Sequence, residues 1–80
     1  MNFLTDDLRY IIRKIYILND TAAKQLTELG MQEGYNRRDY EQATAYCAKA
    51  QGLWYANSML RSELLKAGLI DILKGINDDN

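Results

Sequence analysis

The chain has 80 residues, with 10 Lys and Arg against 11 Asp and Glu and a formal net charge of −1. This balance excludes the strongly acidic surface of a DNA mimic and gives no general attraction to nucleic acid. Because the chain has no His and only one Cys, an internal disulfide is excluded, and neither a metal site nor a cofactor is expected.

Pro is absent and good helix formers are frequent, so the sequence predicts an all-α fold. We expect one helical domain over residues 1–80, without a membrane span and located in the cytoplasm. It is predicted to be a small bundle of three to four antiparallel helices with the long third helix at its centre. Their expected ranges are 3–18, 21–33, 39–66 and 69–76, followed by a frayed tail over 77–80.

The first predicted helix carries two apolar lines. Along one line the spacing alternates between four and three residues, which places its members on one face; these are Leu4, Leu8, Ile11, Ile15 and Leu18. The second line steps by seven and comprises Phe3, Tyr10 and Ile17. A helix with two apolar lines requires cover on two sides, so we expect one line in the domain core and the other against a further helix or chain.

The sequence Asn19-Asp20-Thr21 consists of residues that often cap helices, and it predicts a break before a second helix over 21–33. Gly34 is the expected left-handed residue at the end of that helix. Residues 35–38 then form a short connection to the third helix.

The third helix is predicted to begin at Asp39, with Gln42 as its capping-box partner. One broad face carries larger apolar residues, among them Tyr46, Leu53, Trp54 and Leu64. The opposite side carries small residues that let another helix approach closely, namely Ala45, Ala48, Gly52 and Ala56.

Asn57 and Arg61 interrupt the larger apolar face, which leaves two interpretations open. Either the helix breaks near Asn57-Ser58, or these polar groups are buried and paired. An unbroken helix of this length spans about 42 Å, whereas a compact domain of 80 residues has a radius of gyration of about 12 Å. A long helix therefore indicates a dimer, and we favour it. Gly68 is expected to end it, and residues 69–76 to fold back as a lid.

The residue types in the sequence offer few candidates for catalysis. Cys47 has no His to act as its base, and free Cys is usually a small core residue. Asp6-Asp7 and Asp78-Asp79 lie at the ends of the chain, where a helix cap and a solvated tail account for them. The glycines are isolated and form no phosphate-binding loop. The protein is therefore not expected to be an enzyme.

A second interpretation is a nucleic-acid-binding regulator. It would use basic and aromatic residues of the loop and of the first helix, because cations contact phosphates and aromatic rings stack on bases. The candidate contacts are Arg9, Arg13, Lys14, Tyr35, Arg37 and Arg38.

Part of the chain resembles one helix pair of a tetratricopeptide repeat, through Leu29-Gly30, Asp39-Tyr40, Ala43, Tyr46 and Ala50. The spacing to Ala43 is one residue longer than in that family, and no Pro closes the second helix. A single copy is present, whereas such repeats need about three for stability. The resemblance implies a similar helical hairpin without membership of the family.

The sequence therefore favours a small non-enzymatic protein-interaction module: an adaptor, regulator or inhibitor that docks on a partner protein. We also expect it to associate with itself as a homodimer, because its helices carry more apolar surface than one small core needs. The predicted partner interface comprises Phe3, Tyr10, Ile17, Ala45, Ala48, Gly52 and Ala56.

Overall fold

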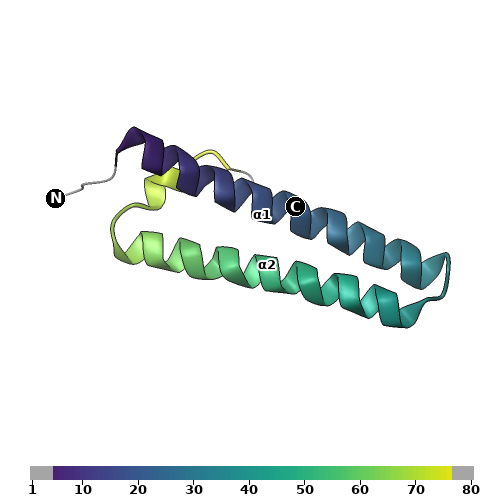
Figure 1. The fold of residues 1–80 in the computed structure, drawn as a ribbon. Helices are drawn as coiled ribbons and strands as arrows, with labels where there is room; N and C mark the ends of the chain where they lie inside the picture. The colour runs from purple at the N-terminus through teal and green to yellow at the C-terminus, as the bar shows by residue number, and fades with distance from the viewer. Residues whose placement is uncertain (1–4, 77–80) are drawn as a thin grey trace.

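The computed structural model describes residues 5–76 as an antiparallel helical hairpin. Helix α1 (Asp6–Tyr35) and helix α2 (Tyr40–Lys66) lie side by side over their full lengths (Figure 1). A 3-10 turn, η1 (Ile70–Leu73), then folds back at the open end of the hairpin. Phe3, Leu4 and the predicted frayed tail over 77–80 lie outside the described residues.

The all-α class is confirmed, but the expected bundle of three to four helices is wrong, because residues 5–76 contain only two α-helices, which pack against each other. The two helices predicted over 3–18 and 21–33 are one helix of 30 residues. The residues expected to separate them contact α2 instead. Asn19 donates to Asn57, and Asp20 accepts from Trp54, so neither side chain caps a new helix.

Local capping signals determine where both helices begin. The Thr5 side chain accepts a hydrogen bond from the amide of Leu8, and Asp6 and Asp7 follow in the first turn, where the helix dipole favours negative charge. The Asp39 side chain accepts from the amide of Gln42 and starts α2 at the expected place.

The loop between the helices differs from expectation. Gly34 is the penultimate residue of α1 and does not end it in a left-handed conformation. The left-handed residue is Arg38, with a φ of 56°. The amide of Asp39 bonds the carbonyl of Glu33 across the loop, which closes the turn without a glycine.

Gly68 ends α2 as expected, with a φ of +74° that glycine adopts without strain. The amide of Leu69 bonds the carbonyl of Leu64, and the amide of Gly68 bonds that of Leu65, which is a Schellman motif. The segment over 69–76, here named the strap, does fold back. It contains a 3-10 turn where an α-helix was expected.

Buried residues along the hairpin repeat every seven positions in both helices. Tyr16, Ala23 and Gly30 are buried in α1, and the buried residues of α2 are Ala50, Asn57 and Leu64. A seven-residue repeat is the signature of helices that pack as a coiled coil. Helix α2 runs through Asn57 without a break, since Asn57 is buried and paired.

The hairpin is long and thin, with extents of 53 × 19 × 17 Å and a radius of gyration of 15.5 Å. A compact domain of this length would have a radius of gyration of about 12 Å. Its hydrophobic cluster lies at the strap end and comprises Tyr16, Leu64, Ile72 and Leu73.

Candidate protein-docking face

The hairpin has two broad sides, which the bond between Trp54 and Asp20 distinguishes. The indole Nε1 donates to the Asp20 carboxylate at 3.2 Å, so both side chains lie on the same side of the interhelix seam. Residues seven positions apart share a side in such a seam. Arg13 therefore lies on this side of α1, and Cys47 and Arg61 lie on it in α2.

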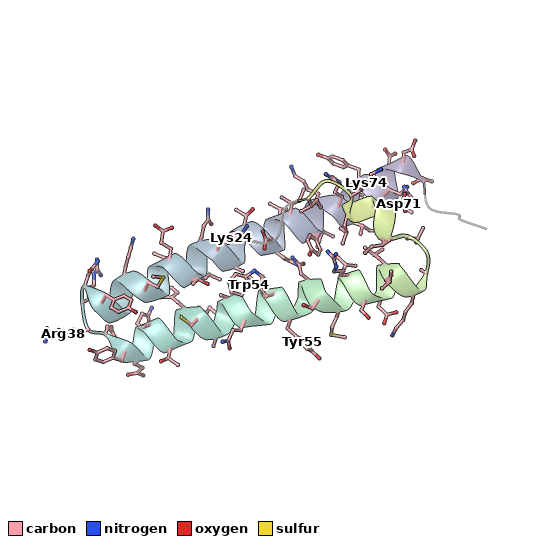
Figure 2. All side chains as sticks on the ribbon, turned by 180° about the vertical axis from the view of Figure 1, so that it is seen from behind. Lys24, Arg38, Trp54, Tyr55, Asp71 and Lys74 are labelled. Carbon is pink, nitrogen blue, oxygen red and sulfur yellow. The ribbon has the colours of Figure 1, made fainter. Side chains whose placement is uncertain are left out.

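The strap covers the first side at the open end of the hairpin. Arg13 Nη1 donates to the carbonyl oxygens of Ile72 at 3.0 Å and of Lys74 at 2.7 Å. Arg9 forms an ion pair with Asp71, a strap residue that Figure 2 labels. Arg61 lines a hollow together with strap residues. We call this the strap side.

The opposite side, named here the apolar face, consists mainly of aliphatic residues from both helices. In α1 its inner row is Ile12, Asn19 and Leu26, which lie one position before the strap-side row. In α2 the inner row is Tyr46, Leu53 and Leu60. Outer positions complete the face with Leu8, Ile15, Ala22 and Leu29 from α1 and Lys49, Ala56 and Glu63 from α2.

Much of this face is accessible. Leu8, Ile15 and Leu29 are 46%, 47% and 41% exposed, and the inner-row aliphatic residues are half-buried. Ile11 and Leu18 extend the apolar surface along the outer edge of α1, and both are exposed. Contiguous apolar patches beyond a few hundred Å² are rare on soluble monomers and mark interaction sites.

The main apolar line of α1 therefore does not form the core of the hairpin. Leu8, Ile11, Ile15 and Leu18 are all exposed, whereas Tyr16 lies in the seam. The reason is visible in the seam itself, where small and polar residues allow close helix approach. A Cβ added at Gly30 would lie 2.9 Å from the sulfur of Cys47 and 3.1 Å from the carbonyl oxygen of Ala43. At the loop end the helices thus contact through small residues.

A pair of asparagines in the seam, of which Asn57 is buried, fixes the alignment of the two helices. Asn57 is 4% exposed, donates to the carbonyl of Tyr16 at 2.9 Å and accepts from Asn19 at 3.0 Å. Both bonds require Asn57 to lie level with the third and fourth turns of α1. A single buried Asn can specify register in coiled coils at a cost in stability. The hairpin cannot slide along this seam without breaking both bonds.

The predicted partner-interface residues are distributed over several surfaces. Tyr10 and Ile17 lie on the strap side of α1, and Ala45, Ala48 and Gly52 lie on the outer surface of α2, where a Cβ at Gly52 would meet no atom within 4 Å. Only Ala56 belongs to the apolar face, and Phe3 lies outside the described residues. The missed residues had a signal, because Leu8 and Ile15 lie on one of the two apolar lines of the first helix, whereas the predicted interface comprises residues of the other line.

The six candidate nucleic-acid contacts do not form one surface. Arg9 and Arg13 hold the strap at one end of α1. Tyr35, Arg37 and Arg38 are exposed at the other end, about 40 Å away along the helix axis. Arg37 also pairs with Glu33 at 3.4 Å. Lys14 is exposed near the strap end and does not connect the two groups.

Two further residues with distinctive side-chain chemistry, Cys47 and Trp54, contact the opposite helix. Cys47 is half-buried next to Gly30. Trp54, which the sequence places on the larger apolar face of the third helix, is 37% exposed, lies between the two helices (Figure 2) and donates to Asp20. Within residues 5–76 no cluster of three potential metal-binding side chains occurs, and neither helix is long and apolar enough to cross a membrane.

Comparison with known proteins gives no relative: no family model, no curated protein and no solved structure matches the chain.

Proposed function

We propose that this chain is a small non-enzymatic protein-interaction module that works as a homodimer, in which two apolar faces pack together as a four-helix bundle. The observation that carries the proposal is the exposure of Leu8, Ile15 and Leu29 on the same side as half-buried Leu26 and Leu53. Both helices contribute to that face, as expected of one half of a bundle.

The weakness of the hairpin's own core supports the proposal. Six hydrophobic residues are buried among the described residues, and none of the large side chains is fully buried. Below about 70–80 residues a single core rarely supplies more than about 3–5 kcal/mol, and association is one common source of further stability. Burial of the apolar face would add to the core the aliphatic residues that the hairpin leaves outside.

The dimensions of the hairpin allow an interface of standard size on this face. Extents of 53 by 19 Å give a footprint on the order of 1,000 Å², compared with about 800 Å² per partner in a standard interface. A dimer of this kind leaves the outer surface of α2, with Ala45, Ala48 and Gly52, available for a different partner protein. As an adaptor or regulator, the chain would bind its partner protein through that surface.

Sedimentation equilibrium of the whole chain tests the proposal. The wild type is expected at twice the 9.2 kDa chain mass, whereas Ile15→Glu should sediment as a monomer because it places a charge in the interface. Tyr10→Glu is the matched control, since Tyr10 is 62% exposed on the strap side of the same helix; it should remain dimeric. A monomeric wild type at high concentration, or a dimeric Ile15→Glu, would overturn the proposal.

A further inference from the structure

We infer that the two copies pack antiparallel, α2 against α2 and α1 against α1, with the twofold axis passing over Ala56. This inference rests on the dimer proposed above and specifies its geometry. It is carried by three residues on the outer positions of the apolar face, Lys49, Ala56 and Glu63. They occur every seven positions along α2, with opposite charges at equal distances from a small residue.

The charges are self-complementary under this twofold axis. In an antiparallel pair centred on Ala56, residues equally far from Ala56 on the two copies come together. Lys49 then meets Glu63 of the partner subunit, and Glu63 meets Lys49 of the partner subunit, about 10 Å either side of the axis. Ala56 at the centre contributes little volume, so the two α2 helices can approach closely.

The charged side chains are placed for this role. The Lys49 ammonium lies 6.0 Å from the centre of the Tyr46 ring, which belongs to the inner row of the face. Glu63 has only a weak exposed contact with Lys66, at 3.4 Å with both side chains about 70% exposed. Because that contact is solvent-exposed, replacing it with Lys49 of the partner subunit costs little.

The same axis gives apolar contacts between the α1 helices. The hairpin register places Asn57 between Tyr16 and Asn19 of α1, because it bonds both of them, so Ala56 is level with the turn around Leu18 and Asn19. Around that level, the apolar row of Leu8, Ile15, Ala22 and Leu29 in one copy runs antiparallel to the same row of the partner subunit. These two rows bring apolar side chains together, and neither row contains a charged residue.

The alternative bundle, with the axis along the helices, lacks this complementarity. It would place α1 of one copy on α2 of the other, and each residue would keep its height along the helix axis. Lys49 would then face Ala22 and Leu26 of the partner subunit, and Glu63 would face the apolar start of α1. Each charge would lose water without gaining a partner, which is unfavourable.

Charge reversal in the full chain tests the inference by sedimentation equilibrium. Lys49→Glu and Glu63→Lys each turn both intersubunit pairs into repulsive ones and should raise the dimer Kd about tenfold to a hundredfold. The double variant Lys49→Glu/Glu63→Lys should restore wild-type affinity. An equimolar mixture of the two single variants should form a heterodimer, because every Glu then faces a Lys.

Lys66→Glu provides the matched control. It also removes the contact with Glu63, but Lys66 lies on the outer surface of α2 and is 71% exposed at its side chain, so the dimer Kd should not change. If the wild type is dimeric while both single reversals retain wild-type Kd, or if the double variant is no tighter than the single ones, the antiparallel α2 contact is wrong and the dimer itself stands. A monomeric wild type would remove both the dimer and this geometry.

Discussion

The two ends of the hairpin are stabilised in opposite ways. At the strap end, a third segment adds large side chains, and Ile72 and Leu73 pack on Tyr16 and Leu64. At the loop end no segment is added, and the helices approach through Ala23, Gly30 and Ala50, residues with small or absent side chains.

The two helices are therefore held together by large buried side chains at the strap end and by close backbone approach between small residues at the loop end. Stability at the strap end depends on apolar area, so it should be sensitive to loss of atoms. At the loop end it depends on close backbone approach and should be sensitive to added atoms. Four substitutions, each compared with at least one further variant, test this comparison. Their unfolding free energies must be measured at one fixed protein concentration, since a dimer's stability depends on concentration.

The largest effect is expected at Leu64, which is 5% exposed in the strap-end cluster. Leu64→Ala should lower the free energy of unfolding by about 2–5 kcal/mol, through lost burial and a residual cavity. Urea denaturation followed by circular dichroism measures it. Leu65→Ala is the matched control, since Leu65 is 64% exposed, and it should change stability by less than about 0.5 kcal/mol. Equal losses in both variants would contradict the placement of the cluster.

Detaching the strap should have the next largest effect. Arg13→Ala removes two bonds from a charged donor to the carbonyls of Ile72 and Lys74 and should cost about 2 kcal/mol. Amide hydrogen exchange over residues 69–76 should accelerate in parallel. Arg9→Ala removes an ion pair with Asp71, whose side chain is 60% exposed, and should cost less than about 1 kcal/mol. The comparison fails if Arg9→Ala releases the strap more than Arg13→Ala does.

At the loop end, adding one methyl group should destabilise. Gly30→Ala gains helix propensity, but the new Cβ would lie 2.9 Å from the sulfur of Cys47, so a net loss of about 1 kcal/mol is expected. Gly52→Ala meets no atom within 4 Å and should instead stabilise by about 0.5–1 kcal/mol. Removing the sulfur with Cys47→Ala should reduce the cost of Gly30→Ala. If both glycine variants stabilise equally, the close approach at Gly30 is wrong.

The smallest effect is expected between the two ends, at Trp54. Trp54→Phe keeps an aromatic ring and removes the donor to Asp20, so it should cost about 0.5–1 kcal/mol. Trp54→Ala should cost less than Leu64→Ala despite the larger side chain removed, since Trp54 is 37% exposed. Thermal unfolding of the three variants side by side gives the order. A Trp54→Ala loss above that of Leu64→Ala would place Trp54 in the core after all.

The docking face was only partly predictable from the sequence. The excess of apolar lines on the first helix was evident from their spacing, and it led to the expectation of a second chain. The choice between lines was not evident, because Leu8, Ile11, Ile15 and Leu18 have the periodicity of a core. Only the close approach at Gly30 and the buried Asn57 show that a narrower line faces α2.

Local chemistry in the sequence determined the helical class and three of the helix ends, since Thr5, Asp39 and Gly68 act through bonds to residues at most five positions away. The tertiary structure decided between alternative hydrogen bonds of the same side chain, because one of the alternatives involves a residue distant in sequence. Asn19 and Asp20 are as suited to capping as to bonding across the seam, and the presence of Asn57 and Trp54 on α2 selects the second use. One continuous helix thus replaces two, and the bundle becomes a hairpin with an open apolar face.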